Sequence, residues 1–119
     1  MNISELLTDL TTHYNALIRY YASQLFLTAP QAFQLLAVSA DGISMSGLSH
    51  KLGLDNSTLT RNIQILDKLG LIHRKRDGYD NRVLKVYLTN KGQAIVEEFE
   101  TLLLDLNYLM LKHIDLDNQ

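Results

Sequence analysis

Residues 44–69, "SMSGLSHKLGLDNSTLTRNIQILDKL", limit most narrowly what this chain can fold into. Ser44 is placed to cap a short helix, and Gly53 offers the left-handed conformation that turns a chain after a helix. Asp55 is placed to cap a second helix almost immediately afterwards. Two short helices joined through a glycine turn predict a helix-turn-helix.

The second of these helices is expected to bury one side and expose the other. Its buried side is predicted to be Leu59, Ile63, Leu66 and Leu69. Its opposite face then carries only hydrogen-bonding side chains, namely Ser57, Thr60, Arg61, Gln64 and Lys68. Such a face suits the edges of bases in a major groove, so this segment is interpreted as a recognition helix.

A basic β-hairpin is predicted directly after that helix. The segments "LIHRKR" and "RVLKVYL" alternate as strands do, and "DGYDN" between them supplies the residues that tight reversals need, so that Arg82 opens the second strand. Taken alone, the basic stretch "RKRDGYDNR" is more typical of a solvated loop. After a helix-turn-helix it indicates a wing, whose charged tip reaches a phosphate backbone or a narrow minor groove.

The distribution of charge supports this interpretation, although the whole chain has a net charge of −2. Residues 56–92 carry eight Lys or Arg against three Asp, a net charge of +5. Residues 1–55 carry two basic and four acidic side chains, and residues 93–119 carry one and six, so their net charges are −2 and −5. A basic middle third between acidic flanks is typical of a protein that binds nucleic acid through its middle third.

Long helices are predicted at both ends, over residues 1–28 and 90–115. Apolar residues recur in the first at steps of three and four, and residues 102–111 of the last are apolar on almost all sides. A chain of 119 residues lacks the interior to cover these surfaces, so an isologous homodimer is expected. Aromatic residues on the first helix are expected in a core or interface rather than in a ligand cavity; they are Tyr14, Tyr20 and Tyr21.

Between the first helix and residue 41, Pro30 is placed in the first turn of a further helix, whose buried side is predicted to be Phe33, Leu36 and Ala37. No internal repeat or linker interrupts the chain. Residues 1–119 are therefore predicted to form a single domain.

Several chemistries are excluded or disfavoured. The chain has no cysteine, which excludes disulfides and thiolate chemistry, and no nucleophile with a neighbouring base or phosphate-cradling loop is evident, so an enzyme is not expected. The four histidines are scattered singly, and no metal site or cofactor is predicted, although His13 and His113 could meet at a dimer interface. No stretch is long and apolar enough to span a bilayer, and a cytoplasmic protein without membrane contact is expected.

Residues 30–92 resemble the MarR-type winged helix-turn-helix transcriptional regulators, through "STLTRNIQILDKLGLI", then "DNR" in place of the family's wing-tip Asp-x-Arg, then "LTNKG". The resemblance implies a mainly α fold with a small β-hairpin wing, flanked by N- and C-terminal dimerisation helices. It also implies that Arg82 contacts the minor groove or phosphates and that Asp80 orients the wing. With the basic wing residues added, the predicted DNA-binding set is Ser57, Thr58, Thr60, Arg61, Gln64, Arg74, Lys75, Asp80 and Arg82.

The expected function is sequence-specific binding of double-stranded DNA, as a homodimeric regulator that represses by competing with polymerase at an inverted-repeat operator. The alternative is a winged-helix module for protein–protein interaction without specific DNA binding. A third hypothesis refines the first: a small-molecule effector controls DNA affinity by binding one conformation of the dimer better than another. The sequence names neither the operator nor the effector.

Overall fold

The computed structural model describes residues 2–117, and the side chains of residues 105–111 and 113–117 lie outside the description. In chain order its elements are α1 (Ile3–Gln24), α2 (Ala29–Ala37), β1 (Ile43–Ser44), α3 (Met45–Leu52), α4 (Asn56–Lys68), β2 (Ile72–Arg76), β3 (Leu84–Leu88) and α5 (Asn90–Asp117). The chain divides into two compact units, residues 30–96 and residues 1–29 with 97–119. No helix within the described residues is long and apolar enough to cross a membrane.

The helix-turn-helix predicted from the sequence is confirmed at each of its three signals. The Ser44 side chain accepts a hydrogen bond from the Gly47 N–H at 3.0 Å and so caps α3. Gly53 ends α3 in the left-handed conformation, with a φ of 64°. The carboxylate of Asp55 accepts a hydrogen bond from the Thr58 N–H at 2.8 Å and caps α4. Local signals therefore set the start of α3, its end at the turn and the start of α4.

The buried side of α4 differs from the prediction at one position. Leu59, Ile63 and Leu66 are fully buried, as expected, but Leu69 is 43% exposed. The helix ends before Leu69 completes the buried row, because Leu69 is the C-cap and the chain leaves through Gly70, whose φ is 76°. The prediction for Leu69 was therefore wrong.

The inward face of α2 also differs from the one predicted. Ala37 is buried as expected, but Phe33 and Leu36 are only half-buried. The fully buried residues of this helix are Ala32, Leu35 and the polar Gln34. Tertiary packing thus turns inward a row displaced by one position from the most apolar one, so the sequence pattern of this short helix misplaced its face.

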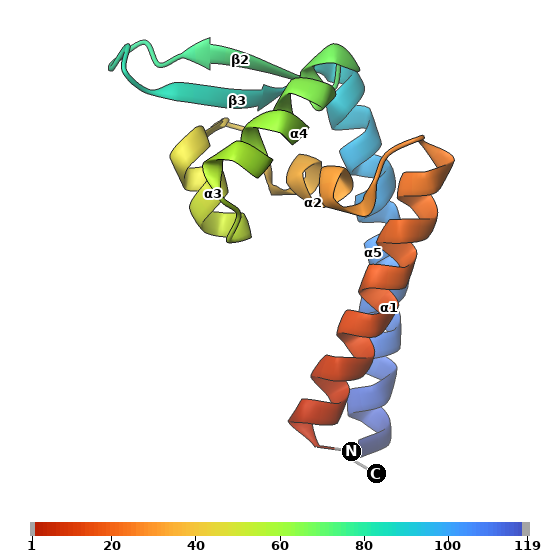
Figure 1. The fold of residues 1–119 in the computed structure, drawn as a ribbon. Helices are drawn as coiled ribbons and strands as arrows, with labels where there is room; N and C mark the ends of the chain where they lie inside the picture. Colours follow the sequence, from red (N-terminus) through yellow and green to blue (C-terminus); the bar gives the residue numbers. More distant parts are fainter. Residues whose placement is uncertain (1, 118–119) are drawn as a thin grey trace. The chain divides into compact units, whose positions relative to one another are not determined.

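The β-hairpin is confirmed, and a third strand joins it. Strands β2 and β3 pair antiparallel, with Arg74 opposite Val86, and the hairpin projects from the helices of its unit (Figure 1). Strand β1 pairs with the other edge of β3, through Ile43 opposite Val86, to give the order β1-β3-β2. At two residues, β1 is too short to show the alternation that reveals a strand in a sequence. The structure begins β3 at Leu84, so Arg82 lies in the turn and not in the strand.

The start of α5 is fastened to the turn between α4 and β2. The Thr89 hydroxyl donates to the Gly70 carbonyl at 2.6 Å and accepts from the Gly92 N–H at 3.1 Å. The Lys91 ammonium donates to the Leu69 carbonyl at 3.2 Å, where it satisfies an acceptor at the end of α4. Gly92 is buried, and a Cβ built there would overlap the carbonyl oxygen of Leu71. These contacts explain physically why "LTNKG" opens this helix.

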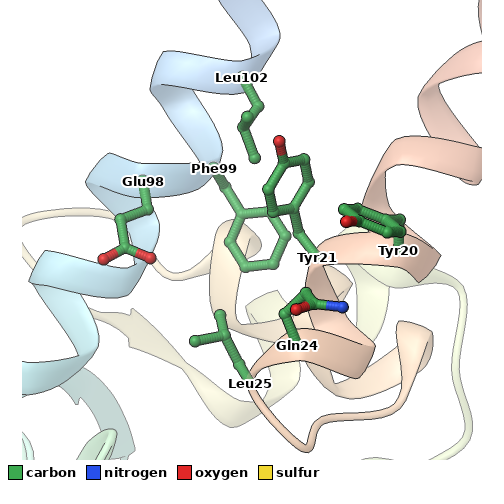
Figure 2. A pocket seen from close by; sticks show the side chains of 7 residues that line it. All are labelled: Tyr20, Tyr21, Gln24, Leu25, Glu98, Phe99 and Leu102. Carbon is green, nitrogen blue, oxygen red and sulfur yellow. The ribbon is translucent and has the colours of Figure 1, made fainter.

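In the other unit, α1 and the later part of α5 lie side by side (Figure 1). The ring of Tyr21 meets Phe99 edge-on, with the centroids 6.5 Å apart, whereas Tyr20 is 59% exposed. Both tyrosines line a hollow of about 310 Å³ (Figure 2), and Tyr14 is not part of its wall. Most side chains of the apolar run 102–111 lie outside the description, as does His113.

Candidate nucleic-acid interface

The outer face of α4 presents three of the predicted DNA-binding side chains to solvent. Ser57, Arg61 and Gln64 are exposed and follow one another at steps of four and three, so they line up along one side of the helix. Thr60 is half-buried beside them. The arrangement matches the polar face predicted from the sequence.

Thr58 forms part of the N-terminal cap of the same helix. Its backbone N–H donates to Oδ1 of Asp55 at 2.8 Å, and its hydroxyl donates to Oδ2 at 2.9 Å. These hydrogen bonds, the backbone one first, hold the pKa of Asp55 below its ordinary value. The Thr58 hydroxyl is thus engaged in capping α4, which fixes where the recognition helix begins.

The two faces of the wing carry different basic residues. Arg74 lies on the same face of the sheet as Ile72 and Val86, both buried, because side chains alternate along a strand. Its Nε donates to Oδ2 of Asp67 at 3.2 Å, which ties the wing to the last turn of α4. Lys75 lies on the opposite face, directly across from Lys85. Facing like charges are unfavourable in the free protein and would be relieved by an anionic partner.

The wing tip is ordered by two aspartates. Oδ1 of Asp80 accepts hydrogen bonds from both the backbone N–H and Nε of Arg82, each at 3.0 Å, and Nη2 of Arg82 donates to Oδ2 at 3.2 Å. The Arg82 side chain and then its backbone N–H hold the pKa of Asp80 below its ordinary value. At the other side of the tip, Asp77 accepts from the Tyr79 N–H at 3.1 Å. The hydrogen bonds to Asp80 therefore hold the guanidinium of Arg82 in one orientation, although the Arg82 side chain is 91% exposed.

A hollow of about 440 Å³ separates the wing from the N-terminal ends of α3 and α4. Its lining includes three predicted residues: Thr60, Arg74 and Arg82. A second surface depression, lined by Gln64, Asp67, Lys68 and Arg74, adjoins the first through Arg74. The structure thus joins Thr60, Gln64, Arg74 and Arg82 into one polar and basic surface, while Lys75 lies on the other face of the wing.

Sequence reasoning missed other groups beside and on the wing. Ser46 and Asn56 contribute polar side chains to the larger hollow. On the other face of the wing, Lys85 adds a second positive charge directly across from Lys75. Ser46 and Asn56 lie next to the caps Ser44 and Asp55, so their nearness to Arg82 depends on how β1 places α3 beside the wing. No local pattern reveals that placement. Among the described residues, no group of three or more His, Asp or Glu could hold a metal ion.

Comparison with known proteins identifies the family of this chain. A family model described as transcriptional regulator SarA/Rot matches residues 16–99, which is most of the chain. The chain belongs to the SarA/Rot family of transcriptional regulators. The family and the similar solved structures are those of winged-helix transcriptional regulators and not those of enzymes.

Relatives of this SarA/Rot-family chain agree with that assignment. The transcriptional regulator AdcR of Streptococcus pneumoniae is 27% identical over 96 residues, which cover 81% of this chain and 66% of AdcR. Across the curated relatives that it matches, the chain spans 38–66% of their length. The reduced form of MarR from E. coli is 30% identical, with a TM-score of 0.76 over 95% of this chain and 85% of MarR. A MarR variant complexed with operator DNA is 28% identical, with a TM-score of 0.70 over 93% and 81%. The resemblance to MarR-type regulators is therefore confirmed.

Proposed function

We propose that this chain binds double-stranded DNA in a sequence-specific manner, as a homodimer on an inverted-repeat operator, and represses transcription by competing with polymerase. The observation that carries the proposal is the continuous surface formed by Thr60, Gln64, Arg74 and Arg82, which belongs to the +5 segment. The structural similarity to MarR bound to operator DNA supports it. An effector would act by binding one conformation of the dimer more tightly than another.

In this proposal each predicted residue has a distinct role. The α4 residues Ser57, Thr60, Arg61 and Gln64 face the major groove, and Thr58, whose hydroxyl donates to Asp55, lies at the start of that row. Arg82, aimed by Asp80, contacts the minor groove or phosphates at the wing tip. Arg74 and Lys75 contact the phosphate backbone, which fixes position without reading sequence. Residues 30–92 form the DNA-binding region, and residues 1–28 and 90–115 supply the dimerisation helices.

The test is a binding titration on the DNA that flanks the protein's own gene, repeated at several salt concentrations and accompanied by footprinting. We expect a specific, strongly salt-dependent complex with an inverted repeat whose half-sites lie about 10 base pairs apart. A single asymmetric footprint would contradict the dimeric mode. Equal affinity for operator and random DNA would favour the alternative of a protein-interaction module.

Two variants should distinguish a residue that contacts bases from a residue that contacts phosphates. Gln64→Ala removes an exposed amide that can pair with an adenine edge, so we expect a changed sequence preference. Lys75→Ala removes one phosphate contact, so affinity should fall alike on all sequences and the salt slope should decrease by about one unit. Titrations on operator and random DNA measure both effects. If Gln64→Ala loses the same factor on both DNAs, its assignment to the major groove is wrong.

The dimer should depend on apolar side chains of the unit that holds α1. Ile3, Leu7 and Leu104 are 76%, 58% and 65% exposed in the single chain, so water contacts them unless a second copy covers them. Sedimentation should report twice the chain mass at micromolar concentration, and Leu104→Glu should shift the population toward monomer. Leu69→Glu is the matched control, because Leu69 is also exposed but belongs to the DNA-binding unit. A soluble wild-type monomer would refute the proposal.

A further inference from the structure

The tip of the wing carries an aromatic side chain that takes no part in the core. Tyr79 has a relative exposure of 101%, the largest value among the large apolar side chains of the described residues. Tyr20 on α1 is also exposed, at 59%, but its ring meets Tyr21 edge-on with the centroids 5.2 Å apart. Because Tyr79 buries no surface, the hydrophobic contribution to folding does not account for an aromatic ring at this position.

Hydrogen bonds order the turn that carries this ring. The Tyr79 N–H donates to Oδ1 of Asp77 at 3.1 Å. The Asp77 N–H donates to the Val83 carbonyl at 2.9 Å, and the Val83 N–H donates to the Asp80 carbonyl at 3.0 Å. The ring is therefore presented from a turn whose backbone is hydrogen-bonded before any partner arrives. Less conformational entropy is lost on binding from such a turn than from a disordered loop.

The surroundings of Tyr79 favour an anionic partner that also offers apolar surface. Residues 74–82 carry four basic and two acidic side chains, a net charge of +2. Asp80, directly after Tyr79, is paired with the guanidinium of Arg82 through hydrogen bonds of 3.0 and 3.2 Å, which reduces its repulsion of a phosphate. DNA combines both properties, since sugars and stacked bases lie between its phosphates.

We propose that Tyr79 is a wedge that enters the minor groove beside Arg82 and packs its ring against a partly unstacked base step. Apolar side chains of minor-groove proteins insert between base steps in this way. Pyrimidine–purine steps unstack most easily, so we expect one beneath the wing in each half-site. The operator is then also read through its deformability, at a position where Arg82 supplies only charge. This inference rests on the proposed function.

Three variants distinguish the ring from the charge, in titrations on the operator at several salt concentrations. Tyr79→Ala should bind about tenfold more weakly, the effect of one contact between a base and an aromatic ring. Its salt slope should stay unchanged because no charge is lost, whereas Arg82→Ala should reduce the slope by about one unit. Tyr79→Phe keeps the ring and should restore most of the affinity. Equal affinity of Tyr79→Ala and the wild type, or an equal loss in Tyr79→Phe, would overturn the proposal.

Gly78→Ala is the control for the turn itself. It changes the residue next to Tyr79, where a Cβ meets no atom within 4 Å, and it leaves the ring in place. We expect nearly unchanged operator affinity. A loss as large as that of Tyr79→Ala would show that the turn is required and not the ring, which would contradict the wedge. A thermal scan of Tyr79→Ala should give a Tm within about 2 °C of the wild type, as for other surface substitutions.

A change in the DNA tests the base step. Footprinting locates the pyrimidine–purine step beneath the wing, and a stiff A-tract then replaces it. The wild type should lose affinity by about tenfold. Tyr79→Ala should lose much less, because the ring that uses the flexible step is already absent. An equal loss in both proteins, or an operator without such a step beneath the wing, would refute the reading of deformability.

A fluorescent base reports the unstacking directly. The adenine analogue aminopurine is quenched while it is stacked, so its emission at this step should rise when the wild type binds and stay low with Tyr79→Ala. The same analogue outside the footprint is the control and should not respond. Constant emission at the step on wild-type binding would overturn the wedge.

Failure of the wedge differs measurably from failure of the proposed function. If the wild type prefers the operator and Tyr79→Ala binds it equally well, the wedge is wrong and the DNA-binding function stands. If the wild type binds operator and random DNA with equal affinity, the proposed function fails, and the wedge fails with it.

Discussion

Gly92→Ala is expected to destabilise the fold by about 3 kcal/mol and to lower the Tm by roughly 10 °C or more. The added Cβ would overlap the carbonyl oxygen of Leu71, which is backbone and cannot rotate away. That carbonyl also accepts the Thr89 N–H at 3.1 Å, so a shift of Leu71 would disturb the start of α5 as well. Urea and thermal unfolding, followed by circular dichroism, measure the loss.

Gly78→Ala is the matched control for this prediction. Gly78 lies at the wing tip, where a Cβ would meet no atom within 4 Å and where the backbone does not adopt a positive φ. The same chemical change should therefore leave the Tm within about 2 °C of the wild type, as for other surface substitutions. If Gly92→Ala is as stable as Gly78→Ala, the docking of α5 on the turn after α4 is looser than its hydrogen bonds indicate.

Features set by neighbouring residues could be predicted from the sequence. Ser44 and Asp55 cap their helices through atoms three residues away, and Gly53 turns the chain by its own conformation. The bracing of Arg82 by Asp80 is equally local, since only two positions separate them. Each of these interactions depends on short sequence spacing, which is why the pattern of residue types was sufficient.

Features set by distant partners could not be predicted. The two-residue strand β1 pairs with an edge of β3 that is distant in sequence, and the buried face of α2, with Ala32, Gln34 and Leu35, is not the one that its apolar residues predict. Leu69 continues the apolar period of α4, but the helix ends at that position and leaves it exposed. In the candidate site, the ion pair of Arg74 with Asp67 joins strand β2 to helix α4. It depends on the register of β2 with β3, which cannot be predicted from either strand alone.

Arg82→Ala is expected to weaken operator binding by about 1–3 kcal/mol while leaving thermal stability and dimerisation almost unchanged. Stability should persist because the Arg82 side chain is 91% exposed, and a surface ion pair of this kind contributes little to folding. Binding should fall because a planar, permanently charged guanidinium suits phosphates and narrow minor grooves. Its two side-chain hydrogen bonds to Asp80 hold it in a defined direction before DNA arrives. Titration on operator DNA and a thermal scan of the same preparation measure the two effects.

Two further variants distinguish the effect of the orientation of Arg82 from the effect of its charge. Asp80→Ala removes the acceptors that orient Arg82 and should weaken binding in the same direction but by less, because the guanidinium itself remains. Arg19→Ala removes one positive charge from an exposed position on α1, so it alters the net charge equally but should leave operator affinity nearly unchanged. If Arg82→Ala binds the operator as the wild type does, or loses binding only because it unfolds, the wing does not contact DNA. The chain would then fit a protein-interaction module better than a DNA-binding regulator.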